Sequence, residues 1–345
     1  MNTQNCDVVI VGAGFSGLYL LHRLRGLGYS VRVFEAGDDV GGTWYWNRYP
    51  GARCDVESMQ YSYSFSEELQ QEWDWSERFS AQPEILEYAN HVADRFDLRR
   101  GIEFSTTVTA AHFNEESQRW TVTTDKGESL SAQFCVMATG CISAAQTPDF
   151  EGLSNYKGAT YHTGNWPHEE IDFTGKRIAV IGTGSSAIQA IPVLAEQAEH
   201  VTVFQRTPNY SLPSRNGPMT EDYANSWKDN YAALREEQRH TPKGALGEFR
   251  NISGIGAADD ERATAYEERW DRGGSALLGS YRDMLVDESV NETAAEFVRD
   301  KIRTIVKDPQ VAELLAAKGY PIGTKRICID SGYFETFHRD SVALV

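Results

Sequence analysis

Two glycine-rich motifs with the same spacing could each hold the pyrophosphate of a dinucleotide. The first is Gly12-Ala-Gly14-Phe-Ser-Gly17, and the second is Gly182-Thr-Gly184-Ser-Ser-Ala187. In such motifs the first glycine allows a tight turn, the second lets phosphate approach the backbone, and the third position lets a helix pack closely against a strand. Alanine is a permitted variant at that third position. Because the positive end of the following helix favours phosphate, both motifs indicate dinucleotide binding.

The residue at the end of the next expected strand distinguishes the two motifs. Glu35 holds this position after the first motif, where it is placed to accept hydrogen bonds from an adenosine ribose. Arg206 holds it after the second motif, where a guanidinium can bind a 2′-phosphate that a glutamate would repel. We therefore expect an FAD site at the first motif and an NADPH site at the second. The simpler alternatives are a glycine-rich turn with a surface glutamate, and an arginine that is only a surface charge.

The residues expected to bind nucleotide through these motifs form two sets. They are Gly12, Gly14, Gly17 and Glu35 for FAD, and Gly182, Thr183, Gly184, Ser185, Ser186, Arg206 and Thr207 for NADPH.

Each motif lies between elements that could position it. Apolar runs at residues 7–11 and 30–35 predict strands on either side of a helix that ends near Leu27, and runs at 175–181 and 201–204 repeat this pattern. Pro192 lies inside the second helix, where an interior proline favours a kink or a break. The sequence predicts an α/β protein with two Rossmann-like dinucleotide-binding domains.

The segments between these elements are less regular. Residues 40–80 are rich in aromatic residues, glycine and proline, which predicts loops, and a helix is expected at about 83–96. Residues 102–113 and 120–124 predict an antiparallel meander, followed by a buried strand at 134–138. The polar residues at about 220–318 predict a helical insertion without a motif of its own. These assignments divide the chain into an FAD-binding domain at 1–145 and an NADPH-binding domain, with the insertion, at 146–345.

Composition limits the other classes of function. The formal net charge is −17, with 50 acidic against 33 basic residues, which argues against nucleic acid as a partner. The five cysteines are scattered, without metal-ligand spacing, and are expected to be reduced thiols. The start of the chain has no signal-peptide pattern, and no apolar run approaches the ~20 residues that cross a bilayer. We expect a cytoplasmic protein without a metal site or membrane contact; the sequence specifies no oligomeric state, and a monomer is the simplest expectation.

Three further stretches are not explained by nucleotide binding alone. They are Gly41-Gly-Thr-Trp-Tyr-Trp-Asn-Arg-Tyr-Pro-Gly-Ala-Arg-Cys-Asp55, Tyr156-Lys-Gly-Ala-Thr-Tyr-His-Thr-Gly-Asn-Trp-Pro167 and Gly323-Thr-Lys-Arg326. The first resembles the long fingerprint of Baeyer–Villiger monooxygenases at every specified position. The second resembles their other fingerprint, with Tyr156 where phenylalanine is usual, and the third resembles the segment that carries their active-site arginine. The similarity extends from about residue 7 to the end and is strongest to phenylacetone and steroid monooxygenases.

The resemblance implies an NADPH-dependent flavin monooxygenase that acts on apolar ketones. In this family NADPH reduces FAD, and O2 then forms a peroxyflavin that attacks the ketone carbonyl. The resulting Criegee intermediate rearranges to an ester or lactone. Arg326 matches the residue that stabilises the anionic states, Asp55 matches its carboxylate partner, and Lys325 corresponds to a residue that helps to select the 2′-phosphate.

The resemblance also places residues of the long fingerprint beside the flavin. These residues are Gly42, Thr43, Trp44 and Asp55, with Tyr61 just beyond the fingerprint. For Trp44 and Tyr61 the alternatives are a place in the lining of the substrate pocket and packing in a core, because this stretch contains many aromatic residues.

Two other functions remain open at this point. One is a related flavin monooxygenase that oxidises nitrogen or sulfur, although those relatives lack the full pattern from Trp44 to Asp55 and the segment of Arg326. The other is a catalytically incomplete nucleotide-binding fragment. Family members extend well beyond residue 345, so the FAD domain is expected to be incomplete without a C-terminal segment.

Overall fold

The strand, turn and helix expected at each glycine motif are present in the computed structural model, which describes residues 4–241, 244–247 and 249–345. The first motif joins β1 (Gln4–Val11) to α1 (Phe15–Gly26), and β2 (Val31–Phe34) follows. The second joins β7 (Arg177–Ile181) to α5 (Ser185–Gln197), and β8 (His200–Phe204) follows. In both cases the two strands are parallel neighbours, so the predicted α/β class is confirmed.

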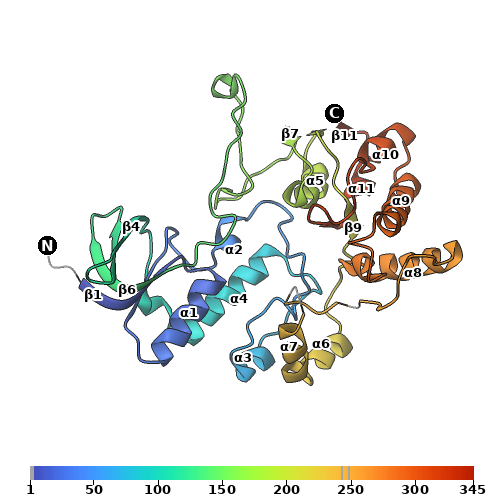
Figure 1. Cartoon of the computed structure of the whole chain (residues 1–345). Helices are drawn as coiled ribbons and strands as arrows, with labels where there is room; N and C mark the ends of the chain where they lie inside the picture. Colours follow the sequence, from blue (N-terminus) through green and yellow to red (C-terminus); the bar gives the residue numbers. More distant parts are fainter. Residues whose placement is uncertain (1–3, 242–243, 248) are drawn as a thin grey trace. The chain divides into compact units, whose positions relative to one another are not determined.

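The chain is divided into two units that do not coincide with the expected domain boundary at residue 145. Unit 1 contains Met1–Arg48 and Gln82–Glu170, and unit 2 contains Tyr49–Ala81 and Ile171–Val345. Figure 1 shows the elements of both units in the colours of the sequence. The segment Tyr49–Ala81 therefore packs with the later half of the chain, although it follows the first motif in sequence.

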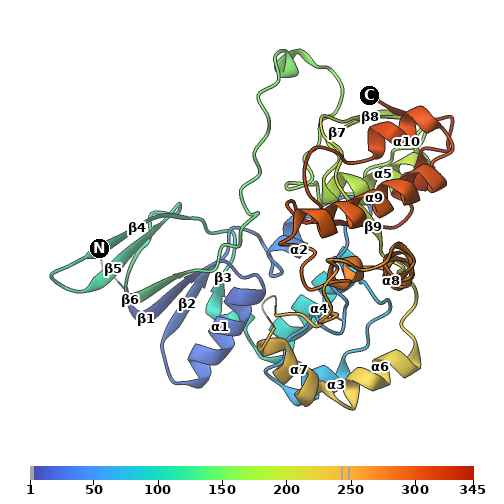
Figure 2. The ribbon, with the colours of Figure 1, turned by 45° about the vertical axis from the view of Figure 1, so that its right-hand side comes forward.

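Unit 1 is built on one six-stranded mixed sheet. Its remaining strands are β3 (Ile102–Glu103), β4 (Val108–Asn114), β5 (Arg119–Thr124) and β6 (Ser129–Met137). The order is β3-β2-β1-β6-β5-β4, with β1 parallel to β2 and β6, and with β4, β5 and β6 antiparallel to one another. The last three strands confirm the expected meander. Figure 2 shows these strands side by side, with α1 next to β2.

Two helices pack the core of unit 1 through regularly spaced apolar residues. In α4 (Gln82–Arg95) the buried residues Ile85, Ala89 and Val92 recur at helical spacing, which places them on one face. In α1 the buried positions are Gly17, Leu18 and Leu21. The shorter helices of this unit are α2 (Thr43–Trp46), η1 (Arg99–Gly101) and η2 (Leu153–Asn155).

The end of β6 is more exposed than the sequence predicts. The interpretation of residues 134–138 as a buried strand is wrong at Phe134 and Met137, whose exposed fractions are 51% and 60%. Cys135 does pack against the buried cluster around Val9 and Phe34. A continuous apolar run cannot show whether both faces of a strand are covered.

Unit 2 has a three-stranded parallel sheet of order β11-β8-β7, in which β11 is Val342–Leu344. A separate parallel pair joins β9 (Ser211–Pro213) to β10 (Cys328–Asp330). The helix α5 continues through Pro192, so the break considered there does not occur.

The polar stretch of unit 2 is helical, as expected. Its elements are α6 (Glu221–Lys228), α7 (Tyr231–Arg239), α8 (Asp259–Arg272), η3 (Ala276–Gly279), α9 (Glu288–Ile305) and α10 (Pro309–Leu315). Two helices outside it, α3 (Glu67–Glu72) and α11 (Tyr333–Thr336), complete the unit. Among the described residues no helix has both the length and the apolar character needed to cross a bilayer.

Candidate functional site

The first glycine turn lies at the amino end of α1 in unit 1. Gly12 has a φ of 104°, and its N–H donates to the Phe34 carbonyl at 2.8 Å, which ties the turn to the end of β2. A Cβ at Gly12 would lie 2.7 Å from the Ala138 carbonyl oxygen, and one at Gly17 would lie 1.9 Å from the Gly12 carbonyl oxygen. Any larger residue would therefore disrupt the turn. Gly14 is the N-cap and has no capping side chain, so backbone N–H groups at this end of α1 can donate to a phosphate.

Glu35 lies beside this turn and is buried. Its Oε2 accepts from the Ala13 N–H at 2.6 Å, and its Oε1 accepts from the Gly37 N–H at 2.8 Å. The carboxylate therefore orders the loop that follows Gly12. Each carboxylate oxygen has more than one acceptor direction, so these bonds are compatible with the predicted contact to a ribose.

Gly41 and Gly42 form an additional turn in unit 1, which packs against the turn at Gly12 and Gly14. Gly42 has a φ of 55°, and a Cβ there would lie 2.8 Å from the Cα of Gly14. The Gly41 N–H donates to the Ala13 carbonyl at 3.1 Å. Thr43 begins α2 directly after this turn, and the carbonyl of the buried Trp44 accepts from Gln82. The structure thus brings Gly42, Thr43 and Trp44 to the first glycine turn.

The second glycine turn, in unit 2, repeats the backbone arrangement of the first. Gly182 has a φ of 103°, and its N–H donates to the Phe204 carbonyl at 2.9 Å. Gly184 is the N-cap of α5, again without a capping side chain. Ser185 follows it, and its hydroxyl lies 3.4 Å from the Cys328 sulfur. This end of α5 can therefore also donate backbone N–H groups to a phosphate.

The segment after β8 is fastened to this second turn. The Thr183 hydroxyl donates to the Thr207 carbonyl at 3.4 Å, and the Asn209 side chain donates to the Thr183 carbonyl at 2.7 Å. Arg206 is exposed and, in the part of the chain that the structure describes, has no carboxylate within ion-pair distance. An exposed cation beside a helix end that can donate N–H groups is suited to an anionic ligand.

Asp55 and Arg326 form an ion pair within unit 2, although 271 positions separate them in the sequence. The Arg326 Nη2 lies 3.1 Å from the Asp55 Oδ2, and their side chains are 74% and 11% exposed. Burial raises the pKa of Asp55, while the Arg326 guanidinium and a hydrogen bond from Gln189 act in the opposite direction. The pair thus joins a nearly buried carboxylate to a cation that keeps most of its surface accessible.

Gln189 is a residue of this site that the sequence did not single out. It lies on α5, and its Nε2 donates to the Asp55 Oδ1 at 3.1 Å. Its Oε1 accepts from the Tyr49 hydroxyl at 2.8 Å. Gln189 therefore links the carboxylate of the ion pair to the helix that follows the second glycine turn. A glutamine within an amphipathic helix has no sequence signal for this role.

The other expected residues lie in both units. Tyr61 is partly buried in unit 2, and its backbone N–H donates to the Glu57 carbonyl at 3.0 Å. Ser186 and Lys325 also belong to unit 2, on α5 and on the segment before β10 respectively. Trp44 belongs to unit 1.

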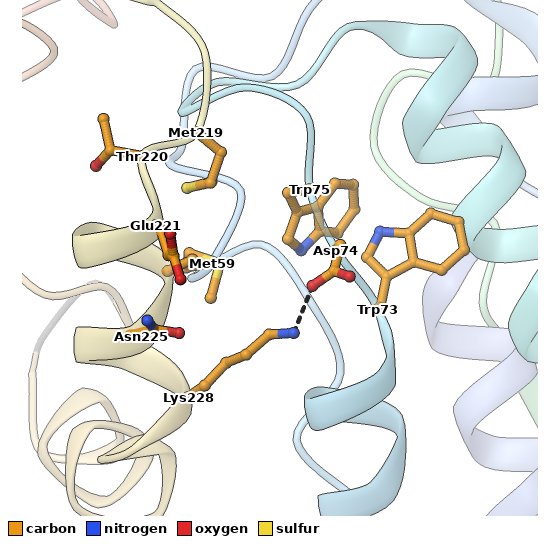
Figure 3. Close-up of a pocket in the computed structure, with 10 residues that line it drawn as sticks. Met59, Trp73, Asp74, Trp75, Met219, Thr220, Glu221, Asn225 and Lys228 are labelled. Carbon is orange, nitrogen blue, oxygen red and sulfur yellow. Dashed lines mark hydrogen bonds and ion pairs between the residues drawn. The ribbon is translucent and has the colours of Figure 1, made fainter.

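One hollow of unit 2 includes the carboxylate of the ion pair. A cavity of about 80 Å³ is lined by Cys54, Asp55 and Gln189, among others. A larger hollow of about 270 Å³ lies between α6 and the segment that carries Trp73 and Trp75, where Lys228 pairs with Asp74 at 2.5 Å (Figure 3). None of the expected site residues lines this larger hollow.

No group of three or more histidine, cysteine, aspartate or glutamate side chains within the described ranges could hold a metal ion.

Comparison with known proteins identifies relatives of this chain. Residues 5–218 match the family model described as flavin-binding monooxygenase-like. The chain is 42% identical to a Baeyer–Villiger monooxygenase of Pseudooceanicola batsensis, over 98% of this chain and 62% of the relative. It is 38% identical to the phenazine N-monooxygenase PhzNO1 of Lysobacter antibioticus, over 98% of this chain and 63% of the relative.

A solved structure of oxidized steroid monooxygenase bound to NADP matches with a TM-score of 0.96 and 54% identity, over 99% of this chain and 65% of that one. The chain thus spans less than two thirds of the length of each of these three proteins.

Proposed function

Because the chain belongs to the Baeyer–Villiger monooxygenases, within the flavin-binding monooxygenase-like proteins, we propose that it uses FAD, NADPH and O2 to convert apolar ketones to esters or lactones. The observation that carries the proposal is the ion pair of Arg326 with Asp55. It places an accessible cation next to a fixed carboxylate in the unit that also contains the second glycine turn.

The residues of unit 1 fit the adenine dinucleotide portion of FAD. The turn at Gly12 and Gly14 supplies backbone N–H groups for the pyrophosphate, and Glu35 lies at the end of β2 for the ribose. Gly42 leaves room for close approach at the same turn, because a Cβ there would clash with Gly14. Bound FAD would supply the hydride acceptance and the activation of O2 that no amino-acid side chain provides.

The residues of unit 2 fit NADPH in preference to NADH. The turn at Gly182 and Gly184 serves the pyrophosphate, and Ser185 and Ser186 begin the helix behind it. Arg206, Thr207 and Lys325 are assigned to the 2′-phosphate, for which the two cations supply opposite charge.

Arg326 is assigned to the reaction itself. Oxygen insertion next to a carbonyl develops negative charge on oxygen, and a fixed guanidinium stabilises that charge. Asp55 holds the guanidinium in place, and Gln189 holds Asp55. Because Arg326 is 74% exposed, its remaining N–H groups can reach a substrate without breaking the ion pair.

A second candidate function is N-oxidation, which is favoured by the 38% identity to a phenazine N-monooxygenase. The two functions share the nucleotide sites and differ in the atom that receives oxygen. They are therefore separated by products and not by cofactor binding.

The test is product analysis with the purified 345-residue chain, loaded with FAD and supplied with NADPH. A panel of apolar ketones, sulfides and aromatic N-heterocycles should yield esters or lactones from the ketones. Sulfoxides or N-oxides without any ester would support the second candidate. Protein that stays colourless when FAD is added, and that converts no substrate, would instead indicate a catalytically incomplete nucleotide-binding chain.

A further inference from the structure

We propose that Tyr320 is a positioning residue for coenzyme selection, which holds Lys325 in place for the 2′-phosphate and links it to the segment of Arg206. The inference rests on the proposed NADPH site and adds a residue to it. It rests on two contacts of the Tyr320 side chain, one made by the face of its ring and one by its hydroxyl.

The first contact restrains Lys325. The Lys325 Nζ lies 4.4 Å from the centroid of the Tyr320 ring, a cation–π geometry. Lys325 is exposed, and within the described chain it has no carboxylate partner. An exposed lysine has many side-chain conformations, so a phosphate that binds it must restrict them. A ring that already holds the ammonium group lowers that entropic cost before the ligand arrives.

The second contact joins Tyr320 to the segment that follows β8. Its hydroxyl donates to the Pro208 carbonyl at 2.7 Å. Pro208 is the second residue after Arg206, so the ring that holds one expected phosphate-binding cation is fastened beside the other. Burial raises the pKa of Tyr320 to about 12, so its hydroxyl keeps its proton and remains a donor at neutral pH.

The position of Tyr320 is itself fixed by buried neighbours. Its ring packs edge-on against Tyr210, with centroids 5.4 Å apart, and Tyr210 is only 3% exposed. The Tyr210 hydroxyl in turn accepts from the buried Arg299 at 3.1 Å. The Tyr320 ring is therefore held rigidly, whereas the exposed Lys325 side chain is flexible. A rigid ring can restrict the conformations of that lysine.

Two ligands that differ only in the 2′-phosphate test the role of Tyr320. Adenosine 2′,5′-bisphosphate and adenosine 5′-monophosphate are titrated calorimetrically into the 345-residue chain and its variants. In Tyr320→Leu, affinity for the bisphosphate should fall about 2- to 5-fold, the usual strength of an exposed cation–π contact, while affinity for the monophosphate stays the same. Tyr320→Phe keeps the ring, so its affinity for the bisphosphate should fall less than that of Tyr320→Leu.

A double variant and a control assign the effect to Lys325. If Tyr320 acts through Lys325, then Tyr320→Leu should have no further effect in a Lys325→Ala background. Tyr29→Leu, at an exposed tyrosine of unit 1 outside the motifs and fingerprints, should bind both ligands as the parent chain does.

Two different results would count against the two proposals. Unchanged preference for the bisphosphate in both Tyr320 variants would overturn the role of Tyr320 alone. A parent chain that binds the two ligands equally would overturn the NADPH site on which that role rests. Circular dichroism of Tyr320→Phe and Tyr320→Leu establishes that a loss of affinity is not a loss of fold.

Discussion

At the scale of single residues, the ion pair joins the nearly buried carboxylate of Asp55 to the solvent-accessible guanidinium of Arg326. The carboxylate is held by Gln189 and by the guanidinium, whereas the guanidinium is largely exposed. Both members of the pair were expected from the resemblance of their segments to the Baeyer–Villiger monooxygenases. Gln189 was not, because its role depends on which loop packs against α5, and only the folded chain shows that.

Substitution of Arg326 tests the chemical role assigned to it. Arg326→Ala should keep NADPH-dependent reduction of the flavin but lower ester formation by about 100-fold or more, since a preorganised donor to a developing oxyanion is lost. Stopped-flow absorbance follows the first step, and gas chromatography follows the second. Arg339→Ala, at another exposed arginine of unit 2, is the control and should form ester normally. Ester formation at the parental rate in Arg326→Ala would refute the role.

Substitution of Gln189 tests the positioning of Asp55 through pH. Burial raises the pKa of Asp55, and the hydrogen bond from Gln189 lowers it, so Gln189→Leu should raise it further. In the proposed mechanism, ester formation requires the ionised carboxylate to pair with Arg326, so activity should fall as pH decreases through the pKa of Asp55. The acid limb of the pH–rate profile should therefore lie at higher pH in Gln189→Leu than in the parent chain. Identical acid limbs would show that Gln189 does not act through Asp55.

At the scale of elements, the strands and helices beside the glycine turns could be predicted because each has a local signal. The short elements could not. α2 has four residues and depends on packing of Gly42 against Gly14 and of Trp44 in the core, and β9 pairs with β10 across more than a hundred positions. Of the kink or break expected at Pro192, the break does not occur, because tertiary packing of the apolar face of α5, including Ile188 and Ile191, overrides the local cost of proline.

The junction of β10 with α11 gives a stability prediction of its own. Asp330 ends β10; its Oδ2 accepts from the Ser211 hydroxyl at 2.7 Å, and burial raises its pKa to about 6. Because Asp330 binds its proton more tightly in the folded chain, the proton stabilises the fold. This contribution is fully present at pH values below 3.8, the ordinary pKa of the carboxyl group, and is lost as pH rises through about 6.

Asp330→Asn, which keeps an acceptor for Ser211, removes this pH dependence. The free energy of unfolding of the parent chain, relative to Asp330→Asn, should therefore decline by up to about 3 kcal/mol between pH 4 and 7. Urea unfolding at a series of pH values measures it, with Asp340→Asn as an exposed control. Parallel pH profiles for the parent and Asp330→Asn would contradict the prediction.

At the scale of the whole molecule, sequence order and spatial order differ. The segment Tyr49–Ala81 follows the first glycine turn in the chain, yet it belongs to unit 2, where it brings Asp55 to Gln189 and Arg326. The sequence-based boundary at residue 145 did not include this assignment, because the local sequence of the segment does not show which distant residues it contacts. The two nucleotide assignments are independent of that division, since each depends on a turn and on the residue that ends its second strand.

The most direct test of the central claim is the fate of molecular oxygen in a single product. The chain, with FAD, NADPH and an apolar ketone, is incubated under O2 labelled with the heavy oxygen isotope, and the product is analysed by mass spectrometry. The expected product is an ester or lactone with one labelled oxygen atom, formed only when NADPH is present. Recovery of unchanged ketone from flavin-loaded protein that oxidises NADPH, or a labelled sulfoxide or N-oxide as the only product of the substrate panel, would contradict it.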